Sequence, residues 1–182
     1  KIRIGMVGGG EGAFIGGVHR IALRLDGYYE LVAGCFSSNF DNSKKTGSSL
    51  GLSEERIYET YQEMAEKESV RSDGIDVVSI VTPNHLHVPV AKIFAEKGIH
   101  IICDKPLAFS SEEANSLKDI IENKKLIFAL THNYTGYPMV RHARSLIKKG
   151  DLGNIRVIQA EYPQDWLTTK AEDTGLKQAE WR

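Results

Sequence analysis

Hydrophobic residues recur along the chain in short runs, each followed by glycine or polar residues. The runs occupy residues 2–7, 31–36, 75–81, 99–103 and 126–130. Apolar runs of this length predict β-strands. The run IDVVSIV at 75–81 is interrupted only by Asp76 and Ser79. Such near-continuous hydrophobicity is typical of a parallel strand that is covered on both faces.

Between these runs, the apolar residues have helical spacing. After Gly16, for example, Val18, Ile21 and Leu25 share one helical face. Two capping boxes, Thr60 with Glu63 and Ser110 with Glu113, predict helix starts. Two other helices are predicted at residues 87–97 and 138–149. A third, for which the helical pattern is weak, ends near residue 51. Strand and helix therefore alternate with short connections, which predicts an α/β fold with a doubly wound, Rossmann-type parallel sheet.

The pattern changes after residue 150. Residues 150–154 (GDLGN) form a turn cluster, and residues 155–162 alternate in a way that the earlier strands do not. We therefore expect two domains. Residues 1–150 form the dinucleotide-binding domain, and residues 151–182 begin a second domain.

Composition narrows the possible partners. The chain has 23 Lys and Arg against 24 Asp and Glu, a net charge of −1, which gives no electrostatic reason for nucleic acid or an anionic membrane as partner. The apolar runs are far shorter than the roughly 18 residues of a membrane span. No basic and apolar leader precedes the first strand, and the two cysteines end apolar runs. We therefore expect a cytoplasmic protein.

A glycine-rich loop (GGGEGAFIGG, residues 8–17) follows the first strand. Glycines at this point let the backbone approach a pyrophosphate, and the N-terminus of the next helix offers free N–H groups. Gly8-x-Gly10-x-x-Ala13 satisfies a relaxed dinucleotide fingerprint. A loop lengthened by three residues, with Gly16 as the third glycine, is the alternative. Either arrangement predicts a bound dinucleotide.

The choice between NAD and NADP stays open. An acid that binds the adenosine ribose is expected at the end of the second strand, where the chain has no acid before Asp41. Ser37 and Ser38, with Lys44, could hold the 2′-phosphate of NADP. Alternatively, these serines belong to an ordinary loop and NAD binds through Asn39 or Asp41.

Three further motifs follow predicted strands. They are TPNHLH at 82–87, DKP at 104–106 and NYTGYP at 133–138. Open α/β sheets bind ligands at the carboxyl ends of their strands. With the glycine loop, these motifs make the whole chain resemble the Gfo/Idh/MocA family, with Asp-Lys-Pro in place of the family's usual Glu-Lys-Pro.

The resemblance implies an enzyme that transfers hydride between NAD(P) and a hydroxyl-bearing carbon of a sugar, cyclic polyol or related compound. It also implies a second α/β domain with a mostly antiparallel sheet, through which family members often form homo-oligomers. The family's catalytic Asp and His come from a later Asp-x-Gly-x-x-His segment, which these 182 residues lack. We therefore expect the chain to be about half of the working enzyme.

The resemblance also implies roles for particular residues. Lys105 corresponds to the lysine that reaches both the nicotinamide ribose and the substrate hydroxyl, and so is the candidate catalytic residue. Tyr134, Trp166 and Arg182 are candidates for substrate binding. The remaining cofactor-binding candidates are Gly8, Gly10, Gly12, Ala13, Phe14, Ile15, Ser37, Ser38, Thr82, Pro83, Asn84, His87, Asp104, Pro106 and Asn133.

The chemistry of these residue types supports the assignment of Lys105. An ammonium at the ligand-binding edge can hydrogen-bond a reacting hydroxyl and stabilise charge as the proton leaves. We expect Asp104 to position this turn and His19 to be structural. His85 and His87 lack a third ligand at suitable spacing, so we expect no metal site. The alternatives are a non-catalytic NAD(P)-binding sensor, in which Lys105 would have no task, and a methyltransferase-type Rossmann protein, which fits the motifs poorly.

Overall fold

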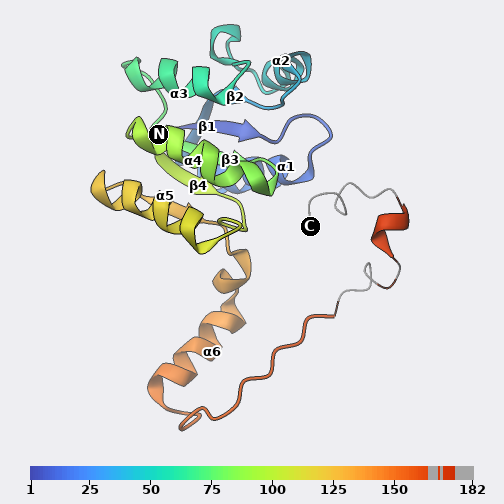
Figure 1. The fold of residues 1–182 in the computed structure, drawn as a ribbon, viewed down its shortest axis with the longest axis vertical. Coiled ribbons are helices and arrows are strands. Elements are labelled where there is room, and N and C mark those ends of the chain that lie inside the picture. The colour runs from blue at the N-terminus through green and yellow to red at the C-terminus, as the bar shows by residue number, and fades with distance from the viewer. Residues whose placement is uncertain (164–167, 169, 175–182) are drawn as a thin grey trace. The chain divides into compact units, whose positions relative to one another are not determined.

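The computed structural model describes residues 1–163, 168 and 170–174. The chain divides into two compact units, Lys1–Thr131 and His132–Arg182 (Figure 1). The first unit contains the parallel sheet. This unit ends at Thr131, directly after the last strand. The sequence analysis placed the domain boundary later, at residue 150.

Five strands form one sheet in the order β2-β1-β3-β4-β5, and all four neighbouring pairs are parallel. This order reverses direction at β1, as in a doubly wound sheet. The predicted Rossmann-like α/β fold is therefore confirmed. The strands are β1 (Ile2–Gly8), β2 (Tyr29–Cys35), β3 (Val77–Val81), β4 (His100–Cys103) and β5 (Phe128–Leu130).

Helices follow each of the predicted strands. The α-helices are α1 (Phe14–Leu25), α2 (Phe40–Ser49), α3 (Tyr61–Val70), α4 (His87–Glu96), α5 (Ser111–Asn123) and α6 (Pro138–Lys149). Short 3₁₀ helices are η1 (Glu54–Arg56), η2 (Asn84–Leu86), η3 (Asn133–Gly136) and η5 (Ala171–Thr174). The apolar spacing predicted that the first helix begins at about Gly16. In the structure α1 begins two residues earlier, at Phe14.

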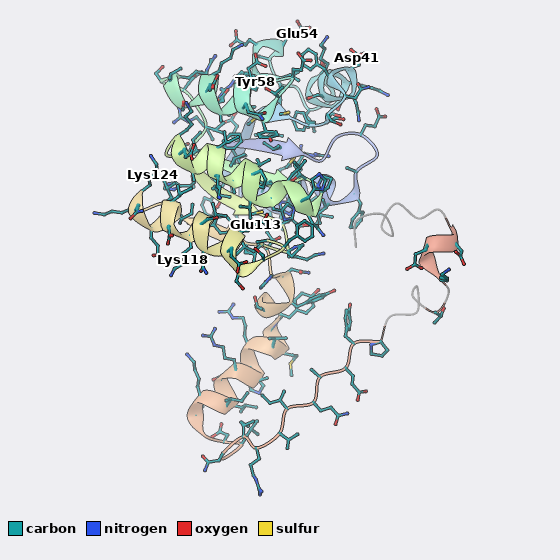
Figure 2. The ribbon with its side chains drawn as sticks, viewed as in Figure 1. Asp41, Glu54, Tyr58, Glu113, Lys118 and Lys124 are labelled. Atoms are coloured by element: carbon teal, nitrogen blue, oxygen red, sulfur yellow. The ribbon has the colours of Figure 1, made fainter. Side chains whose placement is uncertain are left out.

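Both predicted capping residues, Thr60 and Ser110, cap helix starts through their hydroxyls. Thr60 Oγ1 accepts a hydrogen bond from Glu63 N at 3.1 Å, and Ser110 Oγ accepts one from Glu113 N at 3.2 Å. The Glu113 side chain, labelled in Figure 2, also accepts from Phe109 N at 3.1 Å. These side chains satisfy amides that the first helical turn leaves without partners.

Apolar side chains cover both faces of the sheet, because successive strand residues point to opposite sides. Met6, Phe36 and Val81 form a cluster with Ile15 and Leu23, which belong to α1. A larger cluster on the other face includes β-strand residues such as Val78 together with buried residues of α3, α4 and α5. This two-sided burial explains the near-continuous apolar run of β3, all of whose residues are buried.

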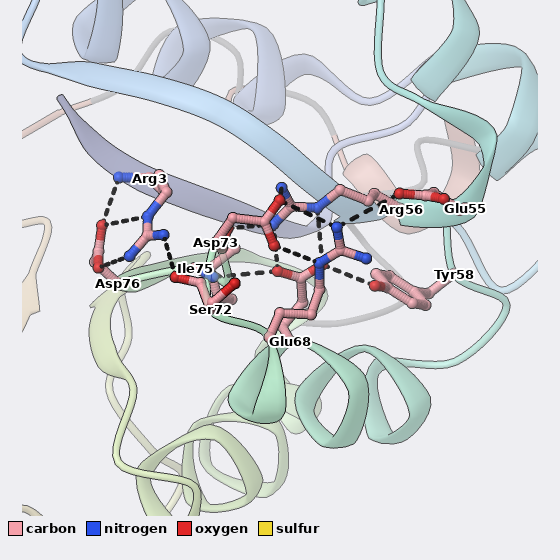
Figure 3. A network of polar contacts seen from close by, with 10 residues as sticks. Arg3, Glu55, Arg56, Tyr58, Glu68, Ser72, Asp73, Ile75 and Asp76 are labelled. Carbon is pink, nitrogen blue, oxygen red and sulfur yellow. Dashed lines mark hydrogen bonds and ion pairs between the residues drawn. The ribbon is translucent and has the colours of Figure 1, made fainter.

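A buried carboxylate joins α3 to the loops beside it (Figure 3). Glu68, only 1% exposed, forms a two-point ion pair with Arg56. It also accepts hydrogen bonds from Tyr58 Oη at 2.7 Å and Ile75 N at 3.1 Å. Burial and the hydrogen bond to Glu68 raise the pKa of the Tyr58 phenol. The carboxylate therefore has donors on both oxygens, as a buried charge requires.

The second unit is described by itself. It contains η3 and α6, and α6 ends at Gly150 in the left-handed conformation typical of a helix C-terminus. The alternating residues 155–162 form no strand in the structure as described. The antiparallel sheet of a second domain therefore stays a prediction. In the described part of the chain, every helix is too short or too polar to span a membrane.

The Glu68 network predicts a specific loss of stability. Glu68→Gln removes the buried carboxylate that pairs with Arg56 at two points and leaves this guanidinium only the exposed Asp73 carboxylate, 3.7 Å away. We therefore expect the free energy of unfolding to fall by about 3 kcal/mol. Denaturant unfolding of the chain measures this change. Glu63→Gln is the matched control on the same helix, because Glu63 forms only an exposed pair with Lys67. It should cost less than about 1 kcal/mol, and equal losses in the two variants would contradict the prediction.

Candidate functional site

The strands end in register at one edge of the sheet. Gly8 pairs with Val81, and Cys103 pairs with Leu130 and with Ile80. The segments that follow β1, β3, β4 and β5 consequently begin along one edge. The glycine loop, the turn after β3 and the Asp-Lys-Pro turn are thereby brought together, as the sequence predicted.

Close backbone contacts shape the glycine loop. Gly10 N donates to Phe36 O at 3.0 Å, and a Cβ atom on Gly10 would lie only 2.8 Å from the same oxygen. A Cβ atom on Gly16 would lie 2.4 Å from Gly9 Cα. Gly16 therefore lets the first turn of α1 pack directly against the end of β1, which is the task of the third fingerprint glycine. The structure thus favours the lengthened loop, with Gly16 as the third glycine, over the Gly8-x-Gly10-x-x-Ala13 fingerprint.

Polar contacts from neighbouring elements hold this loop in place. Arg20 Nη1 donates to Gly9 O at 2.8 Å. Glu11 N donates to Thr46 Oγ1 at 3.0 Å, and the Glu11 carboxylate pairs with Lys45 at 2.6 Å. The loop is therefore anchored both to α1 and to α2.

The exposed part of the loop fits a pyrophosphate. Ala13 occupies the N-cap position of α1 and supplies no side-chain hydrogen bond, and the first turn has no acidic residue. A Cβ atom on Gly12 would meet no atom within 4 Å. Uncapped helix amides beside an open backbone are suited to bind an anionic phosphate group. The predicted cofactor contacts at Gly12, Ala13, Phe14 and Ile15 stay predictions.

The end of β2 presents hydroxyls and an amide rather than an acid. Ser37 Oγ accepts from Asn39 N at 3.1 Å. Asn39 Oδ1 in turn accepts from Asn42 N at 3.0 Å and so caps α2. Ser38 is exposed. The Asn39 side-chain oxygen is therefore engaged at the helix start, whereas the exposed Ser38 follows the end of β2 directly.

Asp104 is held by side chains from two other elements. Its Oδ1 accepts a hydrogen bond from Thr131 Oγ1 at 2.6 Å and lies 3.9 Å from His19 Nε2. His19 Nδ1 is 3.0 Å from Ser79 Oγ. Burial opposes ionisation of Asp104, but His19, Thr131 and the Lys105 backbone N–H outweigh it and lower the pKa of Asp104 to about 2. The predicted positioning role of Asp104 therefore has a physical basis.

Lys105 follows directly and is exposed. No ion pair or hydrogen bond engages its ammonium within the described ranges. The Lys105–Pro106 peptide bond is cis. Burial and the nearby Asp104 raise the pKa of Cys103 to about 12, so this thiol stays neutral. In this turn, the Lys105 ammonium is thus the polar side-chain group that can bind a ligand.

His87 contacts both the turn after β3 and the Asp-Lys-Pro turn after β4. Its ring is buried, with Nδ1 2.6 Å from Pro106 O and Nε2 3.0 Å from Thr82 O. We predicted a contact between His87 and the cofactor. The structure gives no support to a direct polar contact, because backbone carbonyls occupy both ring nitrogens. Thr82 Oγ1, by contrast, is buried and has no hydrogen-bond partner in the part of the chain that is described.

The other predicted residues are less fully placed. Pro83 precedes η2, and Asn84 begins it, on the sheet unit. Asn133 and Tyr134 belong to the second unit, where Tyr134 Oη lies 3.0 Å from Tyr162 Oη. Trp166 and Arg182 lie outside the described residues. The binding roles of these residues stay predictions.

The sequence did not reveal the contact partners of Asp104. Only the His19 contact had a signal, because its other partner, Ser79, is a hydroxyl within a buried strand. Thr131 gave none, and its contact depends on the pairing of β4 with β5. Among the described residues, no three His, Cys, Asp or Glu side chains group as metal ligands.

Comparisons with known proteins agree with this geometry. A family described as "Oxidoreductase family, NAD-binding Rossmann fold" (GFO_IDH_MocA) matches residues 2–134. The uncharacterized oxidoreductase YfiI of Bacillus subtilis is 38% identical over the whole chain, which covers 46% of that protein. The chain therefore spans about half the length of this relative.

Two solved structures resemble the chain closely. An oxidoreductase from Sinorhizobium meliloti has a TM-score of 0.87 and 55% identity, over 92% of this chain and 47% of that one. An inositol dehydrogenase homolog from Azotobacter vinelandii, complexed with NAD⁺, has a TM-score of 0.83 and 39% identity, over 85% of this chain and 40% of that one. A second structure of an inositol dehydrogenase homolog from Azotobacter vinelandii, complexed with NADH and myo-inositol, has a TM-score of 0.82 and 39% identity, over 85% of this chain and 41% of that one.

The environment of Asp104 predicts how stability depends on pH. Its pKa is about 2 in the folded chain and about 3.9 in an unfolded one. Its ionisation therefore stabilises the fold above about pH 4, and this stabilisation is lost as the pH falls toward 2. We expect Asp104→Asn to lower the free energy of unfolding by about 2 kcal/mol near neutral pH.

The gap between wild type and Asp104→Asn should narrow between about pH 4 and 2, and denaturant unfolding at each pH measures it. Thr131→Val removes one donor to the carboxylate and should raise the pKa of Asp104. The carboxyl ¹³C signal of Asp104 reports that pKa directly. A wild-type midpoint near 4 would contradict the prediction.

Proposed function

The chain belongs to the Gfo/Idh/MocA family of oxidoreductases with an NAD-binding Rossmann fold, and on that premise we propose that it binds NAD for hydride transfer. The observation that carries this proposal is the uncapped start of α1 beside the open glycine loop. When bound, NAD supplies a nicotinamide carbon that accepts or returns a hydride. The Thr82 hydroxyl is buried at the same edge and has no hydrogen-bond partner among the described residues, so it is a donor for this ligand.

The end of β2 favours NAD over NADP. A 2′-phosphate calls for a basic side chain, and the nearest candidate is Lys44 on α2. Its ammonium lies 4.4 Å from the centre of the Phe40 ring and 3.9 Å from Asp41 Oδ1. Lys44 is thus engaged with its own helix. Ser38 offers a hydroxyl to the ribose but no positive charge.

Lys105 is the residue that we assign to proton handling. Its ammonium can donate a hydrogen bond to the oxygen of a substrate hydroxyl. As the hydroxyl proton leaves, this contact stabilises the negative charge that develops on the oxygen. The Asp104 carboxylate, which is held by Thr131 and His19, keeps the turn in place and is not itself the proton acceptor.

The substrate class follows from the family and its relatives. The Azotobacter homolog was solved in one structure with myo-inositol, a cyclic polyol whose ring carries the hydroxyl groups. We propose a cyclic polyol or sugar hydroxyl as the substrate of the full-length protein. The acid–base histidine and contacts from Tyr134, Trp166 and Arg182 would complete the site, and subunits would associate through the second domain.

Titration with each dinucleotide tests the cofactor. We expect calorimetry to show NAD binding to the chain, with NADP at least about tenfold weaker because no base faces its 2′-phosphate. Ser38→Asp adds an acid at the ribose position. It should leave NAD binding within a few-fold and weaken NADP further through like-charge repulsion. Equal affinity of the wild type for the two dinucleotides would refute the NAD assignment.

Lys105→Ala tests the catalytic role. In the full-length protein we expect kcat to fall by about 10² to 10⁴, because the hydroxyl loses its charged partner. The affinity for NAD should stay within a few-fold. Lys97→Ala, at an exposed position after α4, is the matched control and should retain wild-type kcat. Normal turnover of Lys105→Ala would eliminate the assignment.

A further inference from the structure

The inference concerns the two carbonyl contacts of His87. His87 is the first residue of α4, and its side chain is almost wholly buried. Nδ1 lies 2.6 Å from Pro106 O, and Nε2 lies 3.0 Å from Thr82 O. The Nε2 distance is within the normal range of N–H···O hydrogen bonds, and the Nδ1 distance is slightly shorter than that range. One ring therefore connects the turn after β3 with the turn after β4.

The chemistry of the partners determines the state of the ring. A carbonyl oxygen accepts hydrogen bonds and cannot donate them. A neutral imidazole has one N–H donor and one acceptor nitrogen, so it can satisfy only one of the two carbonyls. At the other carbonyl it would place a lone pair against oxygen. Both contacts are hydrogen bonds only when both ring nitrogens carry a proton.

Opposing effects act on this charged ring. Burial and the N-terminus of α4 both disfavour a cation. Two charge-assisted hydrogen bonds favour it. The ionised Asp104, two residues before Pro106, supplies negative charge in the same turn. Strand β3 contributes no titratable side chain, and the end of β4 contributes the neutral Cys103 and the exposed Lys105.

We propose that His87 is a positioning residue that, as an imidazolium, donates to Pro106 and Thr82 at once and so fixes the Lys105 turn against the turn after β3. The role in catalysis rests on the proposed function, whereas the proposed charge of the ring is argued from its two carbonyl contacts. His87 acts through Lys105 and does not itself contact the ligand.

The contacts on either side of Lys105 support this role. Before it, Asp104 N donates to Ile80 O at 3.0 Å. After it, Pro106 O accepts from His87. The backbone of Lys105 is therefore held at both neighbours, while its ammonium stays exposed. A lysine on a fixed backbone loses less conformational freedom when it engages a substrate.

The first experiment reads the charge of His87 in the wild-type chain without any ligand. Long-range ¹H–¹⁵N spectra of the imidazole distinguish the two neutral tautomers from the imidazolium. At neutral pH we expect both ring nitrogens of His87 to show the signature of protonated nitrogen. A signature of one unprotonated nitrogen would overturn the proposal. This measurement does not depend on the folding of any variant or on the assigned activity.

The second experiment compares His87→Gln with His85→Gln in the full-length protein. His85 is exposed on η2, two residues earlier, so it controls for the loss of a histidine in this segment. We expect His87→Gln to lower kcat by about tenfold to a hundredfold, to leave NAD affinity within a few-fold, and to shift the amide signals of Lys105 and Leu107. His85→Gln should do none of these.

The outcomes separate this proposal from the proposed function. If the wild type binds no NAD, the proposed function fails while the imidazole spectra still decide the charge of His87. If His87→Gln folds and matches His85→Gln in kcat and amide signals, the positioning role fails although the oxidoreductase assignment stands. If His87→Gln does not fold, the wild-type spectra alone confirm or overturn the doubly donating ring.

Discussion

The register of the parallel strands is the constraint on which the site depends. Gly8 pairs with Val81, and Cys103 pairs with Leu130, so these strands stop in one row. Parallel strands direct their carboxyl ends to the same edge. A shift of one residue in β4 would move Asp104 from its contact with Thr131 and turn neighbouring side chains to the opposite face. The glycine loop and Lys105 share an edge because this register holds.

Much of the fold was predictable because the signals are local. Apolar runs gave the strands, and the capping boxes at Thr60 and Ser110 gave helix starts that the structure confirms. The glycine loop was placed correctly, but its alternative spacings could be separated only by the contact between Gly16 and Gly9. That contact is between helix and strand backbones, and no side-chain pattern encodes it.

The polar contacts of the site were not predictable in the same way. His19 meets Ser79 across 60 residues of sequence, and Thr131 meets Asp104 across 27. Such pairs depend on how the helices and strands pack, not on any local motif. His87 shows the difference most clearly. Its place after a strand indicated a ligand contact, whereas packing of α4 turns the ring toward two backbone carbonyls.

Two carboxylates in this chain, Glu68 and Asp104, meet the same need for hydrogen-bond donors in different parts of the fold. Glu68 and Asp104 each need donors because each is largely removed from water. Glu68 obtains them from Arg56, Tyr58 and the Ile75 amide, and the result is a stabilising network. Asp104 obtains them directly after β4, so the same requirement fixes the turn that carries Lys105.

The state of the groups around this turn limits which of them can handle a proton. Burial keeps the Cys103 thiol neutral, and the Asp104 carboxylate is engaged by its donors. Carbonyls occupy both nitrogens of His87. Lys105 is the titratable group of the described turn whose polar atoms remain free. This is why the proposed proton handling is assigned to Lys105, whose backbone is held by the groups beside it.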